Sequence, residues 1–254
     1  MSDRVILKLG GSVITDKSAD CAINRGRLSE VAMAIAGATT DGIVVIHGAG
    51  SCGHPEARRY QLDKGATAGH TEGIYVTNRA VSSLNDAVVG ALRDEGVAAV
   101  GVHPLHTAIA DNGRLAGFEC RHLGTMLSLG MVPVIHGDVV MDLSRGACIV
   151  SGDQLVRYLA VGLAIDRVGL ATDVPGVLDG GRVVPEITRA TAASLHIGDS
   201  RHTDVTGGMR GKIDELLGLA DAGIGSDIFH VSRVGDFLAG TDHGGTRVRG
   251  EQGG

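Results

Sequence analysis

The chain contains four lysines against 19 arginines, and three of the lysines lie in glycine-rich segments. They are Lys8, Lys17 and Lys212, whereas Lys64 lies outside such a segment. A lysine ammonium is a compact charge on a flexible stem and can follow a moving phosphoryl group, a task that the planar guanidinium of arginine suits less well. One such lysine could arise by chance in a chain with 40 glycines, but three together favour a phosphoryl-transfer site.

The first segment, VILKLGGSVITDK, contains Lys8, the Gly10-Gly11 turn, Ser12 and Lys17. Two adjacent glycines let backbone N–H groups approach phosphate oxygens with no Cβ in the way, and Lys8 can reach the same space. The segment matches neither the Walker pattern GxxxxGK[ST] nor GxGxxG. It therefore indicates phosphate binding of another kind.

The second segment, IVVIHGAGSCGHPEARRY, follows an apolar run and places Gly48, Gly50, Gly53 and His54 on a loop that opens a helix. Backbone N–H groups of such a loop could hold a second phosphate. The His54 side chain can donate a hydrogen bond or a positive charge to that phosphate, since its charge changes near neutral pH. For His47 we favour a structural or capping role.

Three later segments add polar residues at the ends of apolar runs. VPVIHGDVV contains Gly137, and IVSGDQLVRYLA contains Ser151 and Asp153, which by themselves are typical N-cap residues. VGLATDVPGV places Asp173 after a strand, where it could bind a nucleotide, and DVTGGMRGK places Lys212 near the start of a helix. Helix N-termini face the ligand edge of a parallel sheet, so we expect Lys212 to face that edge.

Short runs rich in Val and Ile alternate with longer helical patterns, which predicts an α/β fold with a largely parallel sheet. The expected strands are Val5–Leu9, Ile43–Ile46, Val97–Val102, Val132–Ile135 and Val168–Ala171, and the expected helices are Arg25–Ala36, Thr71–Asp94, Arg121–Leu129, Asp153–Ala164 and Gly208–Ala222. Hairpins are expected over 139–150 and 177–184. A boundary, if the chain has one, falls near Ile165–Arg167.

The bulk composition excludes several classes of function. A net charge of -6 and a pI near 6.0 offer no basic face, and three Tyr, three Phe and no Trp leave little for stacking bases, so we expect no nucleic-acid partner. No run is long enough to span a bilayer, and the start lacks the pattern of a signal peptide. We therefore interpret the four cysteines as reduced thiols of a cytoplasmic protein. His103 and His106 form HxxH without further ligands nearby, so we expect no structural metal.

The motifs KLGGSVITDK, HGAGSCGH, HGDV, SGDQ, TDVPGV and DVTGGMRGK occur in this order over almost the whole chain. In this the chain resembles the amino acid kinase superfamily, and within it most of all the isopentenyl phosphate kinases of the archaeal mevalonate pathway. His54 distinguishes two groups within the family. Members that act on carboxylates lack this histidine, whereas those whose acceptor is a phosphate or phosphonate have it. The long SVITDK segment with Lys17 agrees.

The resemblance implies a three-layer α/β sandwich, with a mostly parallel central sheet between helices, and a homodimer. Residues 1–165 should hold the acceptor phosphate and residues 166–254 should hold ATP, within one compact domain. Residues expected around ATP are Lys8, Gly10, Gly11, Ser12, Lys17, Gly50, Asp173, Gly207 and Lys212. Residues expected at the acceptor phosphate are Ala49, Gly53, His54 and Gly137, and Asp153 should position the lysines.

Three residues depart from the family's usual pattern. Cys52 stands where the family commonly has Phe, Pro175 stands where TDVDG has its second Asp, and Gln154 replaces another frequent Asp. The Cys52 change should alter loop packing more than chemistry. Pro175 removes any nucleotide or metal contact that the second Asp would make, so we leave this position out of the site.

The expected reaction is transfer of the γ-phosphoryl group of ATP to isopentenyl phosphate. Lys8, Lys17 and Lys212 with Mg²⁺, held mainly by the ATP phosphates, should neutralise charge, while His54 fixes the acceptor. Ile74 and Thr77, at i and i+3, could line a pocket for the prenyl tail, although packing against the sheet is the default. The alternatives are a kinase for another phosphate or phosphonate, such as a fosfomycin kinase, and a nucleotide-binding protein without catalysis, which need not retain these lysines.

Overall fold

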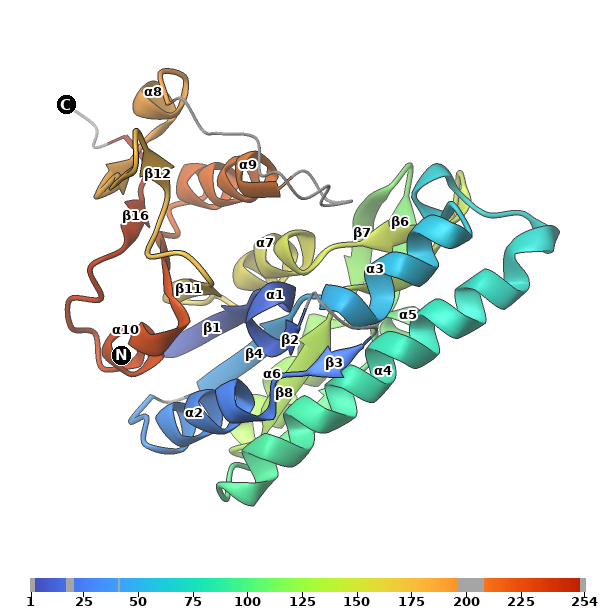
Figure 1. Cartoon of the computed structure of the whole chain (residues 1–254), viewed down its shortest axis with the longest axis horizontal. Helices are drawn as coiled ribbons and strands as arrows, with labels where there is room; N and C mark the ends of the chain where they lie inside the picture. The colour runs from blue at the N-terminus through green and yellow to red at the C-terminus, as the bar shows by residue number, and fades with distance from the viewer. Residues whose placement is uncertain (1–2, 17–20, 41, 196–207, 252–254) are drawn as a thin grey trace.

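A central sheet of eight strands organises the chain (Figure 1). The computed structural model describes residues 3–16, 21–40, 42–195 and 208–251. The strand pairs in the sheet are parallel except for β15 with β16. The order is β14 (Glu186–Ile187), β16 (Thr246–Val248), β15 (Ser226–His230), β11 (Arg167–Thr172), β1 (Arg4–Leu9), β4 (Gly42–His47), β8 (Val132–His136) and β5 (Ala99–Val102).

Helices cover both faces of this sheet, because alternate residues of each strand point to opposite sides. Val5 and Leu7 of β1 pack in one apolar cluster, together with α2 (Arg25–Ala36), α4 (Thr71–Asp94) and α10 (Val234–Leu238). Ile6 lies in the other cluster, with α6 (Cys120–Ser128), α7 (Gly152–Gly162) and α9 (Gly208–Asp221). Figure 1 shows α2 and α4 along one face and α7 along the other. The predicted three-layer sandwich is confirmed.

A second, four-stranded sheet has the order β10-β9-β6-β7. Its strands are β6 (Ala108–Asp111), β7 (Arg114–Phe118), β9 (Asp138–Asp142) and β10 (Gly146–Val150). Two smaller strand pairs are β2 (Thr15–Asp16) with β3 (Ala22–Ile23), and β12 (Leu178–Asp179) with β13 (Arg182–Val183). The remaining helices are α1 (Gly11–Ile14), α3 (Gly50–Arg59), α5 (Pro104–Thr107), α8 (Arg189–Ala192) and 3₁₀ turns at Leu62–Lys64, Ala68–His70 and Val231–Arg233.

Most of the expected elements are present. The helices over 25–36 and 71–94 have the predicted bounds, and the five expected strands and both hairpins are confirmed with ends that differ by up to two residues. The strands β2, β3, β6, β7, β14, β15 and β16 were not predicted. β15 has the sequence SDIFH and begins with a buried Ser226, so it lacks the apolar start that marked the other strands.

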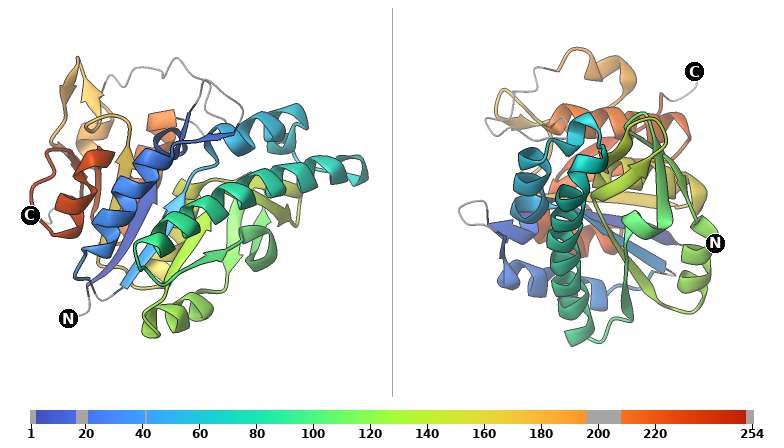
Figure 2. Two further views of the ribbon diagram at one scale, coloured as in Figure 1. Left: turned by 60° about the horizontal axis from the view of Figure 1, so that its bottom comes forward. Right: turned by 90° about the vertical axis from the view of Figure 1, so that its right-hand side faces the viewer.

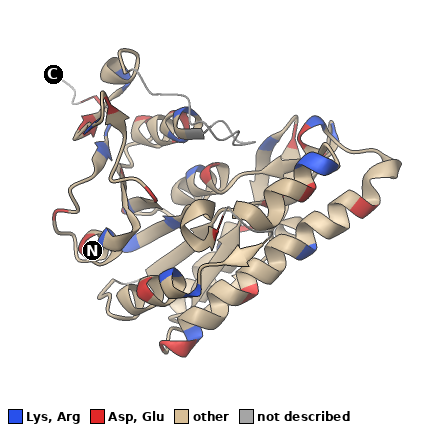
Figure 3. Cartoon of the chain, viewed as in Figure 1, with Lys and Arg blue, Asp and Glu red and all other residues tan. Residues whose placement is uncertain are grey.

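Helices α3 and α4 pack side by side at one end of the sheet (Figure 2). Figure 3 shows Lys and Arg interspersed with Asp and Glu along the drawn elements. Within the described residues, no helix combines the length and apolar character needed to cross a bilayer.

Candidate active site

The glycine-rich loops after β1 and β4 touch each other backbone to backbone. A Cβ on Gly11 would collide with the backbone of Gly50, and one on Gly48 would lie 2.8 Å from the Gly11 nitrogen. Gly50 has φ +54°, and a Cβ there would collide with the Thr15 side chain. The Thr15 hydroxyl donates to the Gly11 carbonyl and accepts from the Ser51 N–H. Glycine is therefore required where the two loops meet.

Several of these glycines use their N–H groups inside the fold. Each of four N–H groups donates to a backbone carbonyl: that of Gly10 to Ala171, that of Gly48 to Leu9, that of Gly53 to Ala49 and that of Gly137 to His47. Phosphate binding by the N–H groups of these glycines stays a prediction, and the structure shows these four N–H groups bonded to backbone carbonyls. Their contribution is close approach without a side chain.

Asp153 holds two of the predicted lysines. It lies in the first turn of α7 after the Ser151 N-cap, whose hydroxyl accepts the Gln154 N–H. Asp153 Oδ1 is 2.9 Å from Lys8 Nζ, and Oδ2 is 3.4 Å from Lys212 Nζ. Burial, the largest influence, would raise the pKa of Asp153, yet Lys8 and Lys212 hold this pKa below its usual value. The ionised carboxylate thus fixes two ammonium groups from β1 and α9 in one place.

A cavity of about 610 Å³ opens over this ion triad. Thirteen of the predicted site residues line it, namely Lys8, Gly10, Gly11, Ser12, Ala49, Gly50, Gly53, His54, Thr77, Gly137, Asp153, Asp173 and Lys212. The structure therefore brings together residues from seven segments between 8 and 212, as expected at the carboxyl edge of a parallel sheet. Among the wall residues, Lys8 comes from β1, Lys212 from α9 and His54 from α3.

One described residue that was predicted for the site lies elsewhere. Ile74 packs in a small apolar cluster with Leu62, Val139 and Ala147, and it is not part of the cavity wall. Ile149 contacts this same cluster and also lines the cavity, so Ile74 stands behind the wall. Lys17 and Gly207 lie outside the described residues.

The cavity wall also contains residues that the sequence did not identify. Arg58 of α3 and Met209 of α9 are two, and apolar Val81, Ile149 and Val150 are others. Helical spacing could have identified Arg58, because it follows His54 by four residues. The apolar wall residues carry no signal of their own, since they belong to ordinary buried patterns.

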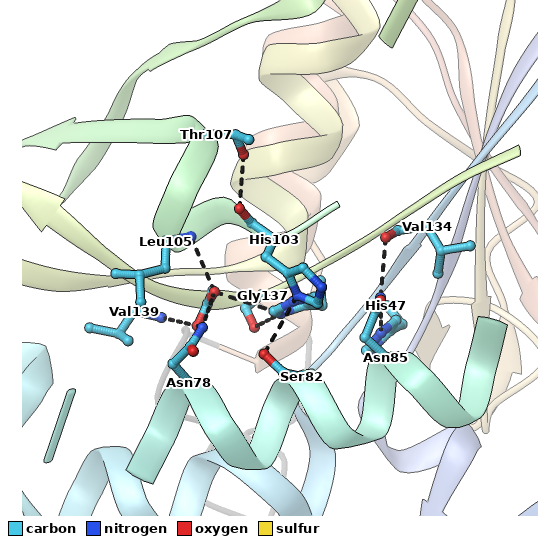
Figure 4. A network of polar contacts seen from close by, with 12 residues as sticks. His47, Asn78, Ser82, Asn85, His103, Leu105, Thr107, Val134, Gly137 and Val139 are labelled. Carbon is cyan, nitrogen blue, oxygen red and sulfur yellow. Dashed lines mark hydrogen bonds and ion pairs between the residues drawn. The ribbon is translucent and has the colours of Figure 1, made fainter. Parts of the chain in front are cut away.

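A buried polar network begins at Asp138, which lines the cavity next to Gly137 (Figure 4). Asp138 accepts hydrogen bonds from the Asn78 amide and from the N–H groups of Leu105 and Val139, and desolvation by burial raises its pKa to about 7. His136 Nε2 lies 2.9 Å from His103 Nδ1. Burial lowers the pKa of His136 well below the usual value.

His47, the buried last residue of β4, belongs to the same network. It stacks on His136, and the Asn85 amide donates to its Nε2 over 3.1 Å. Burial lowers the pKa of His47 to about 4, so the ring is neutral at pH 7. These contacts agree with the predicted structural role of His47. His103 takes part through its bond to His136, and no group of three or more potential metal-ligating side chains occurs in the described part of the chain.

Comparison with known proteins places this site in a family. The sequence profile described as "Amino acid kinase family" matches residues 3–230. The chain belongs to the amino acid kinase family. An isopentenyl phosphate kinase of Haloferax volcanii is 43% identical over 97% of this chain and 99% of its own, and one of Methanothermobacter thermautotrophicus is 38% identical over 97% and 99%.

Solved structures agree with the sequence comparison. A crystal structure of an isopentenyl phosphate kinase superposes with a TM-score of 0.85 at 33% identity, covering 96% of this chain and 99% of that one. The product complex of the Thermoplasma acidophilum isopentenyl phosphate kinase has a TM-score of 0.78 at 25% identity, with coverages of 96% and 99%. The amino acid kinase fold of this chain is thus shown by sequence and by structure.

Two of the three departures from the family pattern have a structural account. The Gln154 side chain accepts the Leu115 N–H and so fastens α7 to β7. Cys52 forms a disulfide bond with Cys21. The prediction that all four cysteines are reduced is wrong for this pair, because folding brings together two residues that are 31 apart in sequence. Cys120 and Cys148 are free thiols.

Proposed function

We propose that this amino acid kinase transfers the γ-phosphoryl group of ATP to isopentenyl phosphate and forms isopentenyl diphosphate for isoprenoid biosynthesis by a variant of the mevalonate pathway. The observation that carries the proposal is His54 in the wall of the cavity that also contains the Lys8–Asp153–Lys212 triad. The names of the relatives at 43% and 38% identity support it.

The residues present fit MgATP. Lys8 and Lys212 are ammonium groups with little exposure to solvent, and they border a cavity that Gly11 and Ser12 also line. Such a site favours a polyphosphate, because the anionic oxygens of the polyphosphate can bind the two ammonium groups in place of water. MgATP supplies the phosphoryl group. We propose that Mg²⁺ is bound through the ATP phosphates and that Asp173 contacts the nucleotide.

The proposed mechanism relies on alignment and charge neutralisation. The acceptor phosphate is already ionised at neutral pH, so its oxygen needs little or no general base to attack. Lys8 and Lys212 stabilise the charge on the transferred group, and Asp153 keeps both ammonium groups in position. His54, on α3, donates to the acceptor phosphate. The same role in charge neutralisation is proposed for Lys17.

The remaining parts of the proposal concern organisation. We propose that residues 1–165 bind the acceptor and supply Lys8, Gly11 and Ser12 to the ATP phosphates, and that residues 166–254 bind the rest of the nucleotide. We also propose that the enzyme is a homodimer and that it works in the cytoplasm. The wall formed by Thr77, Val81 and Ile149 is apolar enough to accept a short prenyl chain.

Phosphorus NMR of the purified protein with MgATP and isopentenyl phosphate tests the proposal. A new diphosphate resonance with an equal amount of ADP is expected. Turnover of a phosphonate but not of isopentenyl phosphate would indicate the alternative kinase, and ATP binding without any turnover would indicate a non-catalytic protein. His54→Ala should impair use of the acceptor much more than ATP binding. His122→Ala, an exposed histidine on α6, is the matched control.

A further inference from the structure

Arg58 lies in the wall of the cavity on the same helix as His54. The two residues are four apart, so their side chains project from the same face of α3. Side chains of an α-helix tilt toward its N-terminus, and a long side chain covers the turn before its own Cα. The side chain of Arg58 is therefore long enough to cover the turn that contains His54.

The charges around the cavity bear on the role of Arg58. The described wall contains three cationic side chains, Lys8, Lys212 and Arg58, and three acidic residues, Asp138, Asp153 and Asp173. Of the three acidic residues, Asp153 contacts both lysines. Arg58 thus brings positive charge to the side of the cavity formed by α3. The whole chain has a net charge of -6, so a phosphate monoester approaching it needs local positive charge at its binding site.

We propose that Arg58 binds the phosphate group of the acceptor together with His54 and so contributes to the preference for phosphorylated acceptors. A guanidinium can give two parallel hydrogen bonds to phosphate oxygens, which fixes orientation as well as charge. This role rests on the proposed function, because it concerns the acceptor of that reaction.

The adjacent Arg59 provides a matched control. Its guanidinium lies 5.3 Å from the ring centre of Tyr60 and 3.9 Å from Glu56 Oε2, and Arg59 is not part of the cavity wall. Its side chain is 71% exposed. R58A and R59A therefore remove the same charge from the same helix, and only the first removes it from the cavity wall.

Steady-state kinetics of R58A, R58K and R59A with isopentenyl phosphate and ATP test this role. R58A should raise the KM for the acceptor about tenfold to a hundredfold, with the KM for ATP changed less than about twofold. R58K should retain part of the affinity, because it keeps the charge but loses the paired geometry. R59A should resemble the wild type. Equal effects of R58A and R59A, or an R58K variant equal to the wild type, would overturn the proposal.

Calorimetric titration with inorganic phosphate separates this role from the proposed reaction. Weaker phosphate binding by R58A than by R59A, at unchanged melting temperatures, supports the proposal even if the wild type does not phosphorylate isopentenyl phosphate. Identical phosphate affinities of the two variants would contradict the role of Arg58 even if the wild type is an active kinase.

Discussion

Replacement of Asp153 by Asn should both destabilise the protein and weaken nucleotide binding. The amide has nearly the same shape as the carboxylate, but it leaves the ammonium groups of Lys8 and Lys212 without their counter-charge. The Lys8 side chain is only 5% exposed, so water cannot take over this role. The variant therefore tests whether the ion triad organises the site.

The expected loss follows from the geometry. At 2.9 and 3.4 Å, two unit-charge attractions amount to about 6 and about 5 kcal/mol with an effective dielectric constant of about 20. Desolvation of the three groups offsets most of this, and breaking a buried ion pair on one side typically costs about 3–5 kcal/mol. For a chain of this size, a loss of about 4 kcal/mol lowers the melting temperature by about 8–16 °C.

Thermal unfolding and titration with ATP in the absence of acceptor measure the two effects. Because the pKa of Asp153 is lowered, its stabilising effect is complete above the usual carboxyl pKa and is lost only as pH falls through the lowered value, so the stability difference should stay constant between about pH 6 and 8. Asp142→Asn is the control, since buried Asp142 accepts the N–H groups of Gly113 and Arg145 outside the main cavity.

Asp142→Asn should lose stability and keep its affinity for ATP. An Asp153→Asn variant within about 1 kcal/mol of the wild type would refute the reasoning about the triad. So would a loss of ATP affinity that is equally large in both variants, because the effect would then reflect general loosening of the fold.

Three further predictions concern the surroundings of the site. Reduction of Cys21–Cys52 should lower the free energy of unfolding by up to about 3–4 kcal/mol, by release of the 31-residue loop, and a melting temperature unaffected by dithiothreitol would contradict this. Asp138→Asn should remove a dependence of the unfolding free energy on pH. In the folded wild type Asp138 retains a proton between the usual Asp pKa and about 7, so stability falls by about 1.4 kcal/mol per pH unit across that window. Below about pH 6.5 the lowered pKa values of His47 and His136 make stability rise with pH, opposite to the effect of Asp138. Denaturant titrations must therefore compare wild type and variant at each pH. A stability difference that does not change with pH would contradict the prediction. Gly50→Ala should abolish the loop contact and cost more than about 2 kcal/mol, whereas Gly90→Ala in α4, where a Cβ meets nothing within 4 Å, should stabilise the helix by up to about 1 kcal/mol; a similar effect of both changes would disprove the loop argument.

The sequence predicted the fold where local patterns determine it. The apolar run at β1 and the helical periodicity of α4 are visible within a few residues, and both elements have the expected positions. Strand β15 was missed because its burial depends on neighbours far along the chain. The same limit applies to the Cys21–Cys52 bond, since no local signal identifies its partner.

The site was predicted to a similar extent. Lysines beside glycines pointed to Lys8 and Lys212, and both contact Asp153. The use of Gly53 and Gly137 N–H groups inside the fold could not be read from the motifs, because their carbonyl partners belong to other segments. Arg58 was overlooked among the 19 arginines, which resemble one another until the structure shows which one faces the cavity.

The contact between the loops after β1 and β4 has a consequence for how substrate range can change. Both loops extend from neighbouring strands of one sheet, whose spacing of about 4.8 Å is set by backbone hydrogen bonds. If the proposed function holds, the backbone of these two strands therefore sets the distance between ATP and the acceptor phosphate. Replacement of side chains should leave this distance unchanged. Substitutions on α3 and α4 can reshape the acceptor pocket while the distance over which the phosphoryl group travels stays the same, so new acceptors can be accommodated without rebuilding the catalytic centre.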